Sequence, residues 1–249
     1  MKIIEYGKEN PEVIMLLHGG GLSWWNYREE ANLLKETYHV VLPILDGHAD
    51  SDAPFTTIEE NAKELVSYID ESFQGTVLAI GGLSLGGQIL IEMLSQRSDI
   101  CKCAVIESAL VIPLRLTNIL IAPTFGISYG LIKKRWFSKI QFRSLKIRSD
   151  LFEDYYRDTS KIAKHDMIRF LKSNSSYTIK PGLTNTTAKA IILAGGKERK
   201  EMRRSAEILH WTISDSKLQI LGHYYHGELS LNHPKDYTEL LNSLVIASH

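Results

Sequence analysis

The sequence predicts an α/β fold, in which helices flank a mostly parallel central sheet and a further helical segment is inserted between two of its strands. Two observations predict this architecture. Short apolar runs rich in β-branched residues recur along the chain, and segments with helical periodicity separate them. One long segment, residues 111–178, has no convincing strand and breaks the alternation.

The predicted strands are short apolar runs without polar alternation. A strand that is buried on both faces of a parallel sheet gives such a run. Runs of this kind lie at residues 3–6, 13–17, 40–45, 76–80, 103–106, 190–193 and 218–221. Between two of them, Leu65 and Ile69 belong to one apolar helical face, and Thr57 with Glu60 forms a capping-box pattern at the start of that helix.

The domain organisation follows from length and linkers. The chain has 249 residues, of which 44% are hydrophobic and 23% charged, so it can bury a substantial core. No linker rich in Pro, Gly or Ser flanks the strandless segment. We therefore predict one α/β core, formed by residues 1–110 and 179–249, that carries residues 111–178 as a helical cap.

Charge and hydropathy limit the partners. The 29 basic residues equal the 29 acidic ones, which gives no general electrostatic reason to expect a nucleic-acid partner. Residues 1–11 lack the apolar run of a signal peptide, and the uncharged stretch at 75–91 is too short and too rich in glycine to span a membrane. We expect a cytoplasmic protein without a transmembrane segment, and the sequence leaves a homo-oligomer open.

The segment 76–88 is the most informative motif. A buried strand runs into Gly82-Leu83-Ser84-Leu85-Gly86, and an apolar helix follows. A serine on such a sharp strand-to-helix turn is exposed above the sheet, because the flanking glycines let strand and helix approach closely. The pattern predicts that Ser84 is a nucleophile, and the alternative is a glycine-rich turn without chemistry.

A second glycine run, His18-Gly19-Gly20-Gly21, follows the buried strand 13–17. Glycines leave backbone N–H groups accessible, which is what a developing oxyanion requires. We expect the donors to be the N–H of Gly20 and of Leu85, with Gly21 as a further candidate. The helix that Leu85 opens favours the same negative charge. The alternative is a tight turn that binds nothing.

These motifs resemble the α/β-hydrolase superfamily, and the resemblance covers nearly the whole chain. The segment 43–51 is similar to the family's turn Pro-Asp-Leu-Pro-Gly-His-Gly-x-Ser and departs from it at Ile44, Asp46 and Ala49. In the family this turn is structural, so no catalytic role is expected for His48 or Asp50. The resemblance implies the α/β-hydrolase fold and a nucleophile, an acid and a histidine in that order along the chain.

Two carboxylates compete for the role of the acid. Glu198 follows the strand 190–193 in a loop similar to the family's acid loop, where it would orient the histidine and stabilise the imidazolium. The family more often has aspartate there, and Arg199 and Glu201 make a solvated charged turn the alternative. Glu107, at the end of the strand 103–106, is the reserve candidate, and it could equally line the substrate pocket or cap the first helix of the predicted cap.

Two histidines follow the last predicted strand, at positions 223 and 226. In the family a proline opens the last helix a few residues after the histidine, and Pro234 fits His226 better than His223. A metal site formed by His223, His226 and His233 is disfavoured, since no cysteine or carboxylate set completes it. We expect no metal and no cofactor.

Aromatic and basic residues bear on the substrate. Trp24 and Trp25 follow the glycine run and either form a wall of the substrate pocket, with Gly21 and Glu107, or plug the hydrophobic core. The apolar stretch 114–129 favours a hydrophobic substrate of modest size. The run 133–148 has seven basic residues, no acidic one and interleaved aromatics, so it is either a solvated face or a site for an anionic substrate or surface.

The residues therefore predict a serine hydrolase that cleaves a small carboxylic ester through an acyl-enzyme, with Ser84, His226 and Glu198 as the triad. Thioesters and carbon–carbon bonds are cleaved on the same scaffold and remain alternatives. A dehalogenase or epoxide hydrolase is disfavoured because those relatives have a carboxylate where this chain has Ser84. A ligand-binding or sensory protein with little turnover is the alternative from another class.

Overall fold

The computed structural model describes residues 1–248, and its centre is a seven-stranded sheet with the order β1-β3-β2-β4-β5-β6-β7. Only β1 runs antiparallel, against β3, and the remaining neighbours are parallel. The predicted mostly parallel sheet is thus confirmed. The strands are β1 (Lys2–Tyr6), β2 (Val13–Leu17), β3 (His39–Ile44), β4 (Val77–Leu83), β5 (Cys101–Glu107), β6 (Lys189–Gly195) and β7 (Ser216–Leu221).

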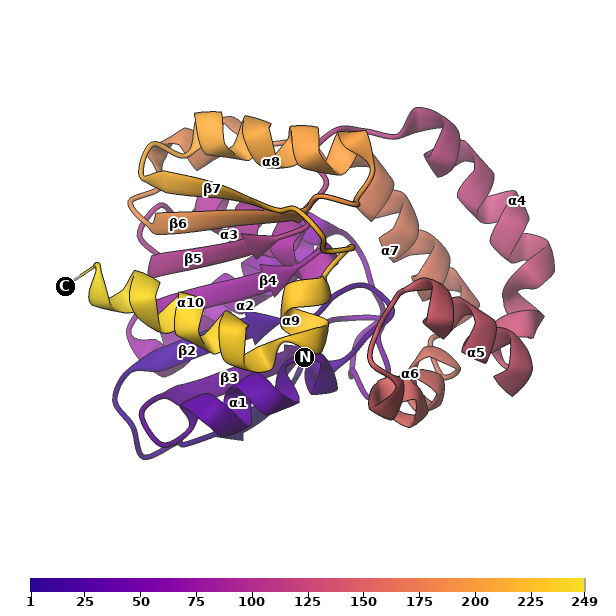
Figure 1. The fold of residues 1–249 in the computed structure, drawn as a ribbon, viewed down its shortest axis with the longest axis horizontal. Coiled ribbons are helices and arrows are strands. Elements are labelled where there is room, and N and C mark those ends of the chain that lie inside the picture. Colours follow the sequence, from indigo (N-terminus) through magenta and orange to yellow (C-terminus); the bar gives the residue numbers. More distant parts are fainter. Residues whose placement is uncertain (249) are drawn as a thin grey trace.

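Two apolar clusters cover the two faces of this sheet, which explains why its central strands read as continuous apolar runs. Every residue of β2, β3 and β4 is buried. One cluster joins the sheet to α2 (Ile58–Phe73), α3 (Leu85–Gln96) and α8 (Lys200–Thr212). The other joins it to α1 (Arg28–Leu34) and α10 (Pro234–Ile246) (Figure 1).

The helix α2 begins with the cap that the sequence predicts, Thr57 followed by Glu60. The hydroxyl of Thr57 accepts a hydrogen bond of 3.1 Å from the N–H of Glu60, and Leu65 and Ile69 are buried on the face that packs against the sheet. A side-chain cap of this kind satisfies an N–H that has no partner inside the helix. The short helix α9 (Glu228–Asn232) precedes α10 on the other side of the sheet.

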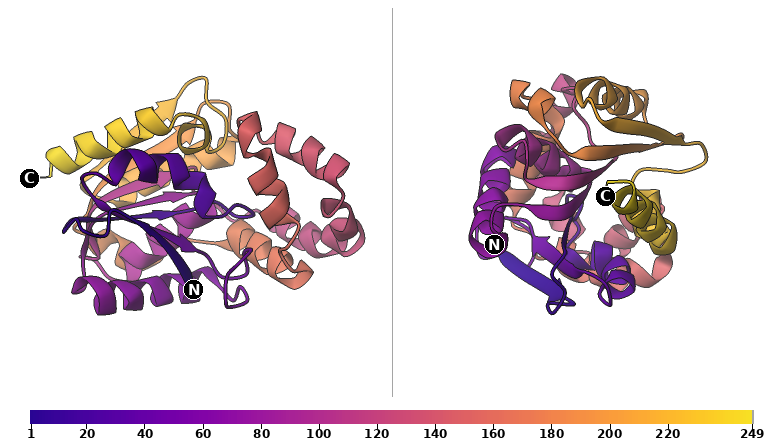
Figure 2. Two further views of the ribbon diagram at one scale, coloured as in Figure 1. Left: turned by 90° about the horizontal axis from the view of Figure 1, so that it is seen from below. Right: turned by 90° about the vertical axis from the view of Figure 1, so that its left-hand side faces the viewer.

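Four helices fill the chain between β5 and β6, and residues 111–178 are called the helical insertion below. They are α4 (Arg115–Ile132), α5 (Arg135–Ser144), α6 (Phe152–Thr159) and α7 (Lys164–Ser176). Figures 1 and 2 show them gathered beyond one end of the sheet, the end at which the parallel strands finish. Three short 3-10 helices complete the elements: η1 (Trp24–Tyr27), η2 (Ser149–Leu151) and η3 (Pro181–Asn185). Within residues 1–248, no helix combines the length and the apolar character needed to cross a bilayer.

Candidate active site

Ser84 occupies the sharp turn between β4 and α3. Its backbone angles are φ 53° and ψ −109°, a strained conformation for a residue with a side chain. The neighbouring glycines make the turn feasible, because a Cβ on Gly82 would lie 2.5 Å from the Gly86 carbonyl oxygen and one on Gly86 would lie 2.1 Å from that of Leu17. The strain and the close packing hold the Ser84 hydroxyl above the ends of the strands.

The Ser84 side chain opens onto a cavity of about 620 Å³ at the end of the sheet where the insertion lies. His226, from the loop after β7, and Glu198, from the loop after β6, line the same cavity. No hydrogen bond joins Ser84 to His226 in the described part of the chain. Such bonds often shorten only when the substrate is in place.

His226 and Glu198 form a direct pair. Nδ1 of His226 lies 2.8 Å from Oε2 of Glu198, and the carboxylate side chain is only 2% exposed, whereas the imidazole is 43% exposed. Because the carboxylate accepts from Nδ1–H, Nε2 is the ring nitrogen that remains for a proton from the serine. The pair therefore has the geometry of an acid that orients a base.

The environment of Glu198 favours its ionised form. Burial alone would raise the pKa of this carboxyl group, but the hydrogen bond to His226 and its charge, together with the bonds from Gly195 and Ser108, bring the pKa below its ordinary value. The N–H of Gly195 donates at 2.6 Å and the hydroxyl of Ser108 at 2.7 Å, both to Oε1. A carboxylate that accepts several hydrogen bonds keeps its charge at neutral pH.

Ser108 is a polar neighbour that the sequence reasoning missed. It directly follows β5, is 1% exposed and has a positive φ of 54°. The available signal was its place at the end of a buried strand beside Glu107, since the ends of parallel strands meet at one edge of the sheet.

The structure brings the two expected oxyanion donors together. A Cβ added to Gly20 would lie 3.5 Å from the Cβ of Leu85, so the glycine run and the start of α3 are in contact. In the described part of the chain, neither the N–H of Gly20 nor that of Leu85 has a hydrogen-bond partner. Gly20 also lines the cavity that contains Ser84. Both donors are thus available to an oxygen bound beside the serine.

Gly21 has a different role from the one predicted. Its N–H donates a 3.0 Å hydrogen bond to Nε2 of His48, so it is not available to a substrate. Burial lowers the pKa of His48 to about 4, and the neutral ring is tied by Nδ1 to the carbonyl of Asp46 at 3.1 Å. This corrects the substrate-binding prediction for Gly21, and it gives His48 the structural role that the sequence predicts.

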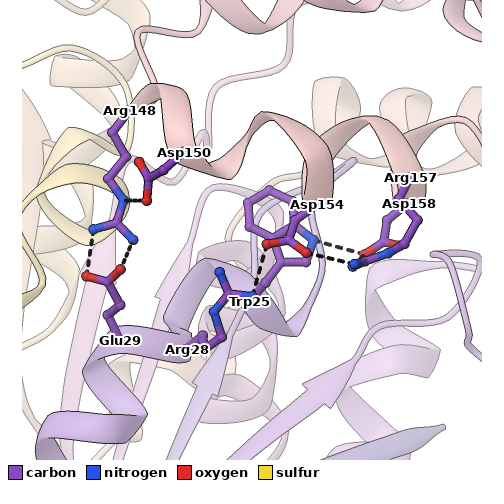
Figure 3. Close-up of polar contacts among 8 residues, drawn as sticks. All are labelled: Trp25, Arg28, Glu29, Arg148, Asp150, Asp154, Arg157 and Asp158. Atoms are coloured by element: carbon purple, nitrogen blue, oxygen red, sulfur yellow. Dashed lines mark hydrogen bonds and ion pairs between the residues drawn. The ribbon is translucent and has the colours of Figure 1, made fainter. Parts of the chain in front are cut away.

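Trp24 and Trp25 do not reach the cavity either. Trp25 is 1% exposed, and its indole N–H donates a 2.9 Å hydrogen bond to Asp158 on α6 (Figure 3). Trp24 packs at the edge of the same buried cluster, with the Arg28 guanidinium 5.8 Å from its ring. Trp25 is thus buried in this cluster, Trp24 packs against it, and neither is among the residues that line the cavity.

Glu107 is not among the residues that line the cavity either. Its Oε1 accepts hydrogen bonds from the N–H groups of Leu229 and Ser230, at 3.1 and 3.4 Å, at the start of α9. Burial raises the pKa of Glu107 to about 7. Glu107 thus caps α9, near the C-terminus. This corrects the predictions that it lines the substrate pocket or caps the first helix of the insertion.

The two other histidines of the predicted metal set, His223 and His233, are not among the residues that line the cavity. His223 is exposed, and the ring of His233 stacks on Tyr224 at 4.9 Å. In residues 1–248, no three His, Cys, Asp or Glu side chains are grouped so as to hold a metal ion.

The cavity wall is mainly apolar, and the insertion supplies much of it. Its apolar lining is Leu22, Leu83, Leu110, Leu114, Ile121, Phe125, Leu145, Ile147, Leu171, Met202 and Leu231. Three residues of the basic run 133–148 line the cavity, namely Ser144, Leu145 and Ile147. None of the seven basic residues of the run is in the lining. The cations in the lining are Lys197 and Arg199, from the loop that carries Glu198.

Two members of the basic run are held in ion pairs. Arg148 binds Glu29 on α1, with Nη1 at 2.6 Å from Oε2, and it also approaches Asp150 (Figure 3). Arg135 binds Glu153 across the insertion, at 2.9 Å. Arg148 therefore fastens the insertion to the core next to the contact between Trp25 and α6.

Comparisons with known proteins agree with this architecture. A family model described as the alpha/beta hydrolase fold matches residues 12–126. No curated protein sequence matches the chain significantly.

Many solved structures have a similar fold. An esterase from Thermogutta terrifontis has a TM-score of 0.81 at 14% identity, over 100% of this chain and 93% of the other. An esterase from Exiguobacterium antarcticum has 0.80 at 19% identity, over 98% and 94%. An enol-lactonase from Burkholderia xenovorans has 0.81 at 13% identity, over 98% and 96%. With its sheet order and its strand-to-helix serine turn, the chain has the α/β-hydrolase fold.

Proposed function

We propose that the protein is a serine hydrolase that cleaves small carboxylic esters, or closely related acyl bonds, through an acyl-enzyme. The observation that carries this proposal is the pair of His226 and buried Glu198, 2.8 Å apart, in the cavity onto which Ser84 opens. A nucleophile, a base and an orienting acid in one cavity are the parts that this chemistry needs.

Acylation uses the three side chains in turn. The Ser84 oxygen attacks the ester carbonyl while Nε2 of His226 takes the hydroxyl proton. Glu198 accepts from Nδ1–H and stabilises the imidazolium that forms. The tetrahedral intermediate then expels the alcohol oxygen, which receives the proton from Nε2, and the acyl group remains on Ser84.

The negative charge of the tetrahedral oxygen is stabilised by the N–H groups of Gly20 and Leu85. The start of α3 adds the positive end of a helix to the same place. Deacylation repeats the steps with water, which gives its proton to His226 and attacks the acyl carbon, so that Ser84 regains its proton as the acid leaves.

The cavity favours a substrate with an apolar acyl or alcohol part of modest size. Its volume of about 620 Å³ and its lining of leucine, isoleucine and phenylalanine suit such a group. The insertion acts as a cap in this proposal, with residues 111–178 above Ser84 and residues 1–110 and 179–249 as the core. The esterases and the enol-lactonase of similar fold carry names that support an ester or lactone bond.

The test measures turnover of short p-nitrophenyl esters and, in parallel assays, of a thioester with the same acyl group. Ser84→Ala should lower kcat by on the order of 10³-fold or more, since triad residues act as a unit. Ser144→Ala is the matched control, because Ser144 lines the same cavity without a histidine partner and should keep its activity.

Two outcomes would contradict the proposal. Wild-type protein without turnover of any ester or thioester would favour a ligand-binding protein. Turnover that survives in Ser84→Ala would remove the serine from the mechanism.

A further inference from the structure

The outer surface of the helical insertion exposes an unusual concentration of apolar side chains. Of the thirteen large hydrophobic side chains exposed within residues 1–248, seven belong to the segment that runs from α4 to the end of α5. They are Leu116, Ile119, Leu120, Ile127, Leu131, Trp136 and Ile140. An exposed apolar patch that is concentrated in this way marks an interaction surface.

The exposed residues of α4 form one stripe. Leu116, Leu120, Ile127 and Leu131 follow at intervals of four, seven and four residues, which places them on one face of the helix. Ile127 is 91% exposed. The cavity lining takes Thr117, Ile121 and Phe125 from an adjoining face of α4, and no residue of the stripe, so the stripe is not required for the wall of the active site.

Basic side chains lie directly beside the apolar residues. On α5, Lys139 and Arg143 lie three residues after Trp136 and Ile140, and Lys133 and Lys134 occupy the turn between α4 and α5. These four cations are exposed and make no ion pair with any residue of the described chain. No acidic residue occurs from 133 to 148.

We propose that this outer face of α4 and α5 binds an anionic lipid surface. Its apolar part comprises Leu116, Ile119, Leu120, Ile127, Leu131, Trp136 and Ile140, and its basic part comprises Lys133, Lys134, Lys139 and Arg143. Helices that lie in a membrane interface bury their apolar face at the boundary of headgroups and acyl chains and hold Lys and Arg at the phosphates. Trp136 has the amphipathic ring that suits this depth.

Charge distinguishes this partner from a second copy of the chain. A symmetric contact between two copies apposes one patch to itself, which would bring the two sets of unpaired cations together. An anionic lipid surface instead complements them. The position of α4 and α5 at the outer margin of the molecule leaves this face uncovered in the chain itself (Figure 1).

The charge part of the proposal is tested by cosedimentation with vesicles. Vesicles that mix phosphatidylglycerol with phosphatidylcholine should bind the wild-type protein at low salt and release much of it at high salt, whereas phosphatidylcholine alone should bind weakly. The triple variant Lys134→Gln, Lys139→Gln, Arg143→Gln should reduce the partition coefficient about 10²-fold. The matched triple variant Lys63→Gln, Lys102→Gln, Lys217→Gln removes three exposed lysines elsewhere and should bind like wild type.

The apolar part is tested separately. Ile119→Ser with Ile127→Ser should weaken binding to the mixed vesicles on the order of tenfold, whereas Ile246→Ser, at a 74% exposed site on α10, should not. Vesicles should shift the tryptophan emission to the blue, and Trp136→Phe should abolish the shift.

Equal binding to neutral and anionic vesicles would overturn the proposal. So would binding that stays intact in the triple variant of Lys134, Lys139 and Arg143 and in the double variant of Ile119 and Ile127. Sedimentation velocity supplies the other decisive result. A wild-type dimer that Ile127→Ser converts to a monomer would assign the face to a second copy of the chain instead.

Discussion

Ser108 donates a hydrogen bond of 2.7 Å to Oε1 of Glu198, the carboxylate oxygen opposite the one that binds His226. The same hydroxyl accepts from the N–H of Gly227 at 3.3 Å. One buried serine at the end of β5 thus joins the loop after β6 to the loop after β7. This arrangement fixes the carboxylate plane in which His226 is held.

The first prediction concerns Ser108 as a positioning residue. Ser108→Ala removes the donor, and a hydrogen bond to a charged group is worth enough to lower kcat on the order of tenfold, with KM little changed. The loss of a bond to the ionised form should also raise the pKa of Glu198, so activity should fall at a higher pH on the acid side.

Ser108→Gly is the control, because glycine also lacks the hydroxyl but adopts the φ of 54° without strain. Steady-state kinetics and pH profiles of both variants should agree. If the glycine variant kept full activity while the alanine variant lost it, the backbone and not the hydroxyl would be the important feature.

The second prediction separates the two candidate acids. Glu198→Gln should reduce kcat substantially, because the amide cannot stabilise the imidazolium as a carboxylate does. Glu107→Gln should have a much smaller effect, since Glu107 binds backbone N–H groups of α9 and not His226. A larger loss in the Glu107 variant would place the acid at the end of β5.

The third prediction uses the raised pKa of Glu107. Burial raises that pKa from 4.5 to about 7, so above about pH 4.5 the unfolded chain releases the proton while the folded chain still holds it. Stability contributed by Glu107 therefore falls as pH rises through this window, by roughly 3 kcal/mol in total.

Glu107→Gln carries no charge at any pH and supplies the reference. Urea unfolding of both proteins should show the wild type losing roughly 3 kcal/mol relative to the variant between about pH 4.5 and about pH 7. A difference that stays constant across this window would show that Glu107 is ionised in the folded protein.

The fourth prediction concerns the mouth of the cavity. The ammonium groups of Lys197 and Lys146 lie 4.8 and 5.8 Å from the ring centre of Tyr225, and neither has an acidic partner in the described residues. Lys197, Arg199 and Tyr225 line the cavity. An ester with a remote carboxylate should therefore have a higher kcat/KM than its neutral analogue, several-fold at low salt and less at high salt.

Lys197→Gln should remove most of that preference, whereas Lys200→Gln, at an exposed neighbour outside the cavity lining, should keep it. Equal kcat/KM values for the two esters at low salt would show that these cations do not contribute to substrate binding.

Much of the fold could be predicted because each strand carries its own local signal. The seven apolar runs correspond to the seven strands, since β2, β3 and β4 are buried on both faces and contain no polar alternation. The parallel order then follows from the helices between them. The strand β7 lies at the edge of the sheet and is only half-buried, and its run 218–221 contains the polar Gln219.

The positions of the candidate site residues were predictable where a strand end marks them. Ser84, Glu198 and His226 each follow a strand of the sheet, and parallel strands bring such residues to one edge. The roles of Gly21, Trp25 and Ser108 depend instead on partners 27, 133 and 90 residues away in the sequence. No local pattern encodes those contacts, so their roles became visible only in three dimensions.

The central claim is that His226 and Glu198 activate Ser84, and labelling with a fluorophosphonate tests it most directly. Peptide mapping of the labelled protein should find one adduct, on Ser84, and ester hydrolysis should disappear in step with labelling. His226→Ala should slow labelling by on the order of 10³-fold, and His223→Ala should not. Full ester hydrolysis in protein that carries the label elsewhere, or that remains unlabelled, would contradict the account.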